Sequence, residues 1–211
     1  MAILNQIKEA VVRGSIEEAT SLTQAALDEN LAPLDILDGG LIKGLEVIGE
    51  KFSRQEVFVP ELLMAAMAMK GGLSLLQPIL EQRDIAPKGK VVIGTVEGDV
   101  HDIGKNIVSM MLLGSGFQVV DLGIDVPAAK FIETVKQEEP DILALSCLYT
   151  PTRLAMKDVM QALKEANLRA KVKVLVGGAP IDQAFADLIG ADGYAPDAPA
   201  GAQKARAWLG K

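Results

Sequence analysis

The sequence contains few of the residue types that bind metals or attack substrates covalently. Its 211 residues include a single histidine and a single cysteine. A lone cysteine excludes an intramolecular disulfide and fits a reducing compartment. One histidine and one cysteine cannot furnish the usual ligands of a zinc site. Because no second histidine is present to activate it, Cys147 is interpreted as a packing residue and not as a nucleophile.

Basic clusters and long apolar runs are also absent from the sequence. The formal net charge is −7, and lysine and arginine form no block of the kind that phosphate-driven nucleic-acid binding requires. No uninterrupted apolar stretch has the length of a membrane helix, and the N-terminus shows no signal-peptide pattern. We therefore expect a soluble cytoplasmic protein without nucleic-acid or membrane partners.

The first part of the chain, residues 1–84, shows only helical periodicity. A first helix is expected to end at Gly14, and Ser15 and Glu18 then form the pattern of a capping box. Pro33 suits the first turn of a third helix, whose four glycines suggest close helix–helix approach. A fourth helix is expected from about Pro60 to Leu80. The expected fold of this part is a four-helix bundle.

After a polar linker at residues 85–90, the pattern changes to alternating strands and helices over residues 91–211. The expected strands cover residues 90–96, 117–122, 141–146, 172–176 and 191–194. The expected helices cover residues 104–115, 127–138, 152–168, 181–188 and 197–209. Short strands rich in Val, Ile and Leu, each followed by a helix, are typical of a parallel sheet covered on both faces. The expected fold is a flavodoxin-like, Rossmann-like doubly wound domain with five strands, which binds ligands beyond the carboxyl ends of its strands.

The single histidine, His101, follows the first of these strands, and Asp99 lies two residues before it. A neutral imidazole is a good ligand for a transition metal, and a carboxylate that accepts its other N–H fixes the tautomer. A hydroxyl from the loop after the third strand could bond that carboxylate in turn. The alternative is a capping loop with His101 in solvent. Small-residue loops after the third, fourth and fifth strands favour the ligand.

Other motifs leave their alternatives open. Gly177-Gly178 fits either a tight strand-to-helix turn or close approach of the backbone to a ligand. The glycine pattern Gly-x-Gly-x-x-Gly of dinucleotide-binding folds does not follow the first strand, which disfavours an NAD-type fold. The sequence also contains no P-loop. Met64 and Met67 share a face of the fourth helix, where bundle core is the simpler explanation than a cofactor lid.

Together these motifs resemble those of cobalamin-binding methyltransferase proteins. The run Asp99-Val100-His101-Asp102-Ile103-Gly104-Lys105-Asn106 resembles the Asp-x-His-x-x-Gly motif of cobalamin-binding domains. The runs Leu145-Ser146-Cys147-Leu148-Tyr149-Thr150-Pro151-Thr152 and Gly177-Gly178-Ala179 resemble the family's second and third loops. The segments Val47–Phe52 and Phe58–Leu63 resemble the helical cap of methionine synthase and of stand-alone corrinoid proteins. The resemblance covers almost the whole chain.

The resemblance implies a cobalamin or related corrinoid whose cobalt takes His101 as its lower ligand, in the arrangement called His-on. It implies that Asp99 forms a hydrogen bond with the far nitrogen of the imidazole, and that the hydroxyl of Thr152 bonds Asp99 in turn, at a position where methionine synthase has serine. Asp99, His101 and Thr152 are therefore the expected catalytic residues. The expected cofactor-binding residues are Gly98, Asp99, Val100, His101, Asp102, Ile103, Gly104, Ser146, Leu148, Thr150, Gly177, Gly178, Tyr194 and Ala198, with Phe58, Leu62 and Met64 in the cap over the methyl-bearing face.

The implied function is that of a methyl carrier, with His101 bound in methyl-Co(III) and released in Co(I), and not that of an enzyme acting alone. The implied partners are a substrate:corrinoid methyltransferase, a corrinoid:folate or corrinoid:thiol methyltransferase and a reductive activase. A cobalamin-dependent sensor would need a DNA-binding module, for which residues 1–84 offer no basic helix. The small subunit of an adenosylcobalamin mutase, which usually lacks the cap, and a non-corrinoid binding module rank lower. The donor is not identified by the sequence.

Overall fold

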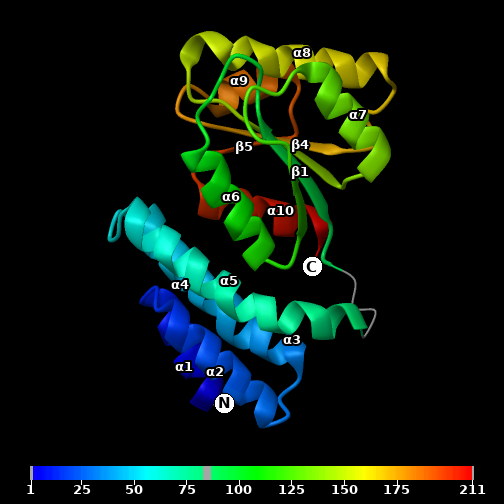
Figure 1. Ribbon diagram of the computed structural model, residues 1–211. Helices are drawn as coiled ribbons and strands as arrows, with labels where there is room; N and C mark the ends of the chain where they lie inside the picture. Colours follow the sequence, from blue (N-terminus) through cyan, green and yellow to red (C-terminus); the bar gives the residue numbers. More distant parts are fainter. Residues whose placement is uncertain (1, 83–86, 211) are drawn as a thin grey trace. The chain divides into compact units, whose positions relative to one another are not determined.

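A computed structural model describes residues 2–82 and 87–210, which form two compact units (Figure 1). The first is the helical unit, built from the residues before 87 together with 113–115. The second is the α/β unit, built from residues 87–112 and from 116 onward. Residues 83–86, which include the first two residues of the expected linker, lie outside the described residues. The boundaries 1–84, 85–90 and 91–211 therefore stay predictions.

The helical unit contains the expected bundle. Its elements are α1 (Ala2–Val12), α2 (Ile16–Asp28), α3 (Pro33–Ile36), the π-helical segment η1 (Leu37–Ile42), α4 (Lys43–Ser53) and α5 (Val59–Gln82). The expected third helix is thus three consecutive segments, because a wider π turn interrupts it at Leu37–Ile42. Pro78 lies inside α5, which continues to Gln82 without ending there.

Glycines in this unit allow the close helix packing that the sequence predicted. A Cβ atom on Gly44 would lie 2.6 Å from the Cβ atom of Val11 in α1. A Cβ atom on Gly72 of α5 would lie 2.6 Å from Cδ2 of Leu41. Real Cβ atoms do not approach this closely, so only glycine permits these contacts.

The predicted capping box at the start of α2 is wrong. Ser15 occupies the N-cap position but makes no side-chain hydrogen bond to the helix. The carboxylate of Glu18 instead accepts two hydrogen bonds of 2.8 Å from Nη2 of Arg13. A charge-assisted pair with arginine is stronger than a bond to a neutral backbone N–H, so Glu18 is drawn away from the capping position.

Helix α5 buries one apolar face against the other elements of its unit. It contacts α1, α2, α3, η1 and α4. Leu62, Met69 and Leu76 recur every seven residues along it and are fully buried. By length and composition alone α5 could cross a membrane, although the sequence pattern predicted no such stretch. Its burial among five neighbouring elements is typical of the core helix of a bundle.

The α/β unit is a five-stranded parallel sheet with the order β2-β1-β3-β4-β5, as the doubly wound prediction requires. Its elements in chain order are β1 (Lys90–Thr95), α6 (Ile103–Gly114), β2 (Gln118–Asp121), α7 (Ala128–Glu138), β3 (Ile142–Ser146), the 3-10 segment η2 (Thr150–Arg153), α8 (Leu154–Glu165), β4 (Lys173–Gly177), α9 (Gln183–Ile189), β5 (Gly193–Ala195) and α10 (Ala198–Leu209). All five predicted strands are confirmed near their expected positions.

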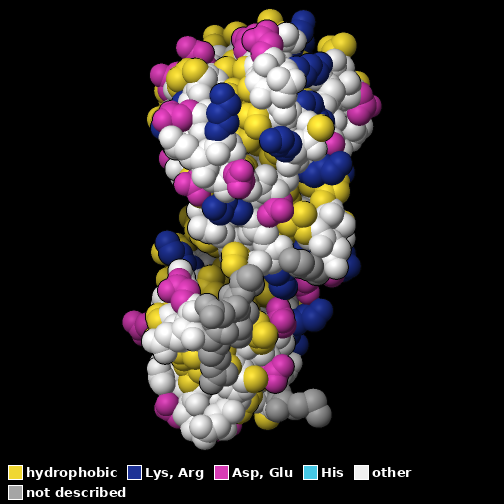
Figure 2. Space-filling model, turned by 90° about the vertical axis from the view of Figure 1, so that its right-hand side faces the viewer, with side chains coloured by type: hydrophobic (Ala, Val, Ile, Leu, Met, Phe, Trp, Pro, Cys, Tyr) yellow, Lys and Arg dark blue, Asp and Glu magenta, His cyan; other side chains and the backbone are white. Residues whose placement is uncertain are grey.

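Helices cover both faces of this sheet (Figure 1). In β3, Leu143 and Leu145 point toward the core formed with α7, α8 and α9. Ile142 and Ala144 point toward the opposite core, which α6 and α10 complete. Because both faces are buried, the strands read as continuous apolar runs without polar alternation. Figure 2 shows acidic and basic side chains interspersed over one side of the α/β unit.

Candidate functional site

The candidate site lies at the carboxyl edge of the sheet and is organised around Asp99. This side chain follows β1 and is 1% exposed. Its Oδ1 atom accepts hydrogen bonds from Nδ1 of His101 at 2.6 Å and from the backbone N–H of His101 at 3.0 Å. Its Oδ2 atom accepts from the backbone N–H groups of Leu148 at 2.6 Å and Tyr149 at 2.9 Å. The loops after β1 and β3 therefore meet at one carboxylate, as the sequence predicted.

The carboxyl group of Asp99 stays ionised well below neutral pH. Burial by itself would raise its pKa, because it penalises the charged form. The hydrogen bonds from Tyr149, His101 and Leu148 outweigh this penalty and lower the pKa below its ordinary value. An ionised carboxylate can only accept hydrogen bonds. The Nδ1 atom of His101 must therefore carry a proton.

The imidazole of His101 presents one free nitrogen outward. Its side chain is 51% exposed, although Asp99 beneath it is buried. Because Nδ1 donates to Asp99, Nε2 of the neutral ring carries a lone pair. Within residues 2–82 and 87–210 the Nε2 atom forms no hydrogen bond. His101 thus has one fixed tautomer and one outward nitrogen that could bind a metal.

The hydroxyl of Thr152, the expected third member of this group, is shared among several neighbours. Its Oγ1 atom lies 2.7 Å from the carbonyl oxygen of Tyr149 and 3.3 Å from Oδ2 of Asp99. A hydroxyl has one proton, and the shorter bond to Tyr149 is the better one. Two backbone N–H groups already occupy Oδ2 of Asp99. Thr152 therefore chiefly holds the loop that supplies these N–H groups.

Cys147 lies under the same loop and has no outward access. It is buried, and its Sγ atom lies 3.3 Å from the carbonyl oxygen of Tyr149 and 3.3 Å from Oγ1 of Thr152. Burial raises the pKa of the thiol above its ordinary value. A buried, protonated thiol is a poor nucleophile. The interpretation of Cys147 as a packing residue is confirmed by its complete burial.

The glycine pair after β4 is explained by contact with the β3 loop. Gly178 has a φ of +126°, and a Cβ atom there would lie 1.7 Å from the carbonyl oxygen of Cys147. A Cβ atom on Gly177 would lie 3.1 Å from the carbonyl oxygen of Ala195. The requirement for glycine at position 178 therefore arises from the protein's own backbone, whether or not a ligand also approaches.

The loop after β2 also contacts Asp99, although no sequence pattern predicted it. The backbone N–H of Asp125 donates to the carbonyl oxygen of Asp99 at 2.9 Å. The Oδ1 atom of Asp125 accepts a hydrogen bond from the backbone N–H of Gly98 at 2.7 Å. Asp125 adopts a φ of +53°, a conformation that aspartate tolerates better than most residues. A lone aspartate in a loop gives no sequence signal for this role.

A buried lysine beside the site was also missed. Lys105 in α6 is 3% exposed and pairs with Asp121 at the end of β2. Its Nζ atom also donates to Oδ1 of Asn106 at 2.7 Å, and Asn106 bonds Oδ2 of Asp102 at 3.1 Å. This chain of contacts links β2 to the residue after His101. Lys105 is the only charged residue in α6, a mostly apolar helix, and this pattern could have revealed it.

The remaining expected residues fall into two groups. Those in the α/β unit all lie at or just beyond the carboxyl ends of its strands: Gly98, Val100, Asp102, Ile103, Gly104, Ser146, Leu148, Thr150, Gly177, Gly178, Tyr194 and Ala198. A Cβ atom on Gly104 would meet open space. The expected cap residues belong to the helical unit, where Leu62 is buried while Phe58 and Met64 are exposed.

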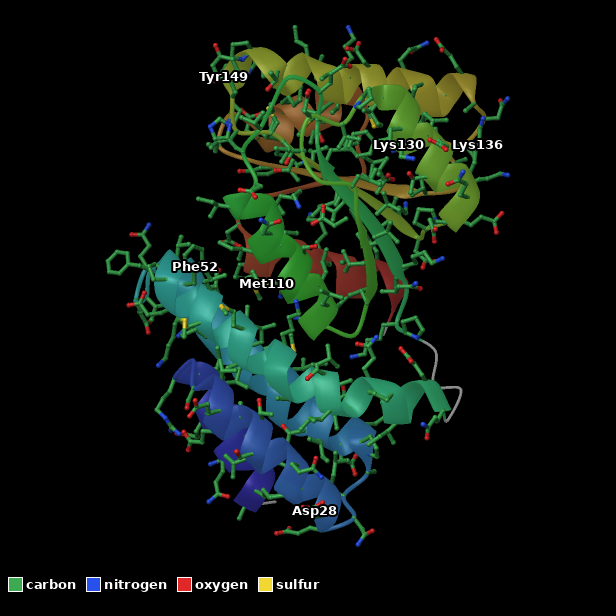
Figure 3. The ribbon with its side chains drawn as sticks, viewed as in Figure 1. Asp28, Phe52, Met110, Lys130, Lys136 and Tyr149 are labelled. Atoms are coloured by element: carbon green, nitrogen blue, oxygen red, sulfur yellow. The ribbon has the colours of Figure 1, made fainter. Side chains whose placement is uncertain are left out.

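Exposed apolar side chains accompany the Asp99 loops. They are Val100, Ile103, Ile124, Leu148, Tyr149 and Leu154. Ile103 is 70% exposed although it begins a helix whose other face is packed. Figure 3 shows Tyr149 at the loop that leads into α8. Exposed apolar groups concentrated at one edge indicate a surface that an apolar ligand covers.

Comparisons with known proteins place the whole chain among cobalamin-related proteins. Two families, each described as a B12 binding domain, match residues 89–202 and residues 3–77. The trimethylamine corrinoid protein of Methanosarcina barkeri is 43% identical, over 98% of this chain and 96% of that protein. The dimethylamine corrinoid protein 3 of Methanosarcina acetivorans is 44% identical, over 98% and 97%. The methanol:cobalamin methyltransferase complex of Methanosarcina barkeri includes a chain that matches with a TM-score of 0.85 at 32% identity, over 99% of this chain and 80% of that one.

Proposed function

The chain belongs to the family of B12-binding corrinoid proteins, and we propose that it carries a methyl group on the cobalt of a bound corrinoid between two partner methyltransferases. The observation that carries the proposal is the pair of His101 and Asp99. A buried, ionised carboxylate holds Nδ1 and leaves Nε2 free beside exposed apolar side chains.

The residues present fit a corrinoid better than a bare metal ion. No group of three or more His, Cys, Asp or Glu side chains among the described residues could hold a metal by itself. A corrin ring brings its own in-plane nitrogen ligands, so the protein needs to supply only one axial ligand. His101 supplies one nitrogen with its tautomer already fixed.

Several groups of this chain would hold the corrinoid. We propose that Val100, Ile103 and Leu148 cover the lower face of the ring around His101, because they are exposed and apolar. Ser146, Thr150, Gly177, Gly178, Tyr194 and Ala198 are proposed to line the path of the nucleotide tail. Phe58 and Met64 are proposed for the methyl-bearing face, supported by Leu62 in the bundle core; Phe58 is 71% exposed.

A bound corrinoid would supply a cobalt ion that accepts and releases methyl groups. The role of the chain is to bind and release this metal through His101. When the imidazole of His101 leaves the cobalt, its Nε2 atom becomes free to take up a proton. The carboxylate of Asp99 then stabilises the resulting imidazolium. The backbone N–H groups of Leu148 and Tyr149 keep Asp99 in place in both states. We propose Asp99, His101 and Thr152 as the residues of this exchange, with Thr152 acting mainly on the loop.

The proposed partners are a substrate:corrinoid methyltransferase, a corrinoid:folate or corrinoid:thiol methyltransferase and a reductive activase, in the cytoplasm. The chain is similar to a trimethylamine and to a dimethylamine corrinoid protein at nearly equal identity, 43% and 44%. Overall similarity therefore does not separate these donors. We propose that the choice of donor rests with the partner that binds it.

The decisive experiment is reconstitution with cobalamin. The purified chain is expected to bind one corrinoid and to show the visible spectrum of a nitrogen-ligated cobalt. His101→Ala is expected to keep the fold and lose that spectrum, whereas Asp187→Asn, at an exposed position in α9, should keep both. If the wild-type chain binds no corrinoid, or His101→Ala leaves the spectrum unchanged, the proposal is wrong.

A further inference from the structure

We infer that Thr95 is a positioning residue for His101, an inference that rests on the proposed function. Thr95 is the last residue of β1 and is completely buried. Its Oγ1 atom donates a hydrogen bond of 2.9 Å to the carbonyl oxygen of His101 itself. Among the side-chain hydrogen bonds of the described residues, this one and the two that Asp99 accepts are those that involve His101.

The hydroxyl of Thr95 occupies a fixed point because both polar main-chain groups of Thr95 are bonded to the loop after β2. Its N–H donates to the carbonyl oxygen of Gly123 at 3.0 Å, and its carbonyl oxygen accepts from the N–H of Val126 at 3.0 Å. In the sheet it pairs in register with Ser146 of β3. A β-branched side chain also has few rotamers, so the position of Oγ1 follows from that of the strand.

Thr95 and Asp99 together hold both polar main-chain groups of His101. Asp99 accepts the N–H of His101 at 3.0 Å, and Thr95 donates to its carbonyl oxygen. Asp99 also fixes the direction of the ring through Nδ1. With its main chain held by the end of β1, His101 can approach or leave a metal only by rotation of its side chain. Thr95 therefore sets the height of the imidazole above the sheet edge.

The test compares three variants of the corrinoid-loaded chain. Thr95→Val has nearly the same shape but no hydroxyl, and Thr95→Ser keeps the hydroxyl without the methyl group. Thr23→Val is the matched control, because Thr23 is also fully buried and its Oγ1 atom donates to a main-chain carbonyl, that of Ala19, at 2.7 Å. The readout is the ratio of His-ligated to unligated cobalt, measured from the nitrogen splitting in the electron paramagnetic resonance of the Co(II) form loaded with cobinamide, a corrinoid without a nitrogen base of its own.

Thr95→Val is expected to lower this ratio about fivefold, the population equivalent of one net hydrogen bond. Thr95→Ser and Thr23→Val are expected to stay within about twofold of the wild type by the same conversion. Since His101 is the only histidine, its imidazole proton resonances report the same change in the unloaded chain without assignment. They should broaden or shift in Thr95→Val alone.

The inference is wrong if Thr95→Val leaves the ratio unchanged, or if Thr95→Ser lowers it as much as Thr95→Val does. The second result would show that packing of the methyl group matters and the hydroxyl does not. Should Thr95→Val fail to fold, Thr95→Ala and Thr95→Ser provide the same comparison. Failure of the proposed function would look different, because the wild-type chain itself would then show no nitrogen splitting.

Discussion

The Nδ1 atom of His101 lies 2.6 Å from Oδ1 of Asp99, and this contact joins a half-exposed imidazole to a fully buried carboxylate. The arrangement separates two functions. The outer residue is free to bind a ligand, while the inner residue is fixed by the backbone of another loop. A carboxylate held in this way fixes the tautomer of the imidazole without moving itself.

Replacement of Asp99 by asparagine should therefore reverse the tautomer of His101. The amide oxygen is expected to take the place of Oδ2, facing Leu148 and Tyr149, so that the NH2 group faces Nδ1. Nδ1 must then accept, and Nε2 carries the proton and no longer has a lone pair for a metal. The NH2 group also opposes the N–H of His101, which should cost about 1–3 kcal/mol of unfolding free energy.

Urea unfolding of the unloaded Asp99→Asn chain and the spectrum of its corrinoid complex test both effects. Loss of nitrogen ligation with little change in corrinoid affinity is the expected pattern. Retained ligation would contradict the role of Asp99. Asp187→Asn is a matched control, because the Asp187 side chain in α9 is exposed and its Oδ1 atom accepts a hydrogen bond from Gln183 and not from His101.

Thr152→Val is expected to act on the loop more than on His101. The variant removes the 2.7 Å bond from the hydroxyl to the carbonyl oxygen of Tyr149, which keeps the main-chain N–H of Thr152 as a donor at 3.0 Å, and should lower the unfolding free energy by about 0.5–1.5 kcal/mol. Because the bond from Thr152 to Asp99 is long, at 3.3 Å, the fraction of His-ligated cobalt should fall less than in Asp99→Asn. An equal or larger fall would show that the hydroxyl is essential to the His101–Asp99 pair. Thr152→Ser should resemble the wild type in both measurements.

Gly178→Ala should prevent stable folding of the α/β unit. Its Cβ atom would overlap the carbonyl oxygen of Cys147 at 1.7 Å, in addition to the strain of a φ of +126°. Gly190→Ala is the matched control, since Gly190 also has a positive φ, +78°, but open space at its Cβ position. It should cost about 1–2 kcal/mol, the price of the left-handed conformation alone. Comparable unfolding free energies for the two variants would contradict the close approach between the β3 and β4 loops.

Stability should fall in acid because Asp192 has a lowered pKa in the folded chain. Burial opposes the lowering, and the N–H of Val174 at 2.8 Å with the cations of Lys173 and Arg169 outweighs it. A carboxyl group whose folded pKa is depressed stabilises the chain above its unfolded pKa of about 4 and loses that contribution as pH falls through the folded value. The pKa of Asp99 is also lowered, so this group likewise stabilises the folded chain near neutral pH and loses that contribution in acid.

Urea unfolding at pH 7 and at pH 3 measures this dependence. Asp192→Asn should lower stability at pH 7 by about 1–3 kcal/mol and reduce the drop between the two pH values. Asp28→Asn, at the exposed end of α2 (Figure 3), should leave both values close to the wild type. A pH dependence in Asp192→Asn as steep as that of the wild type would exclude Asp192 as its source.

The sequence by itself determined the elements and the edge of the sheet at which the site lies. Apolar runs predicted each strand, and the carboxyl ends of parallel strands must share one edge, so the pattern alone brings Asp99, His101 and the β3 loop together. The single histidine made the candidate ligand unambiguous.

Only the tertiary structure decided which groups hold that ligand. The principal donors to Asp99 are the main-chain N–H groups of Leu148 and Tyr149, and every residue except proline has such a group, so no residue type signals them. The role of Asp125 likewise depends on where loops far apart in sequence meet, and the role of Thr95 depends on how the loop after β1 turns back on the strand. The residue expected from the motif, Thr152, is placed second because its single proton has a closer acceptor in Tyr149.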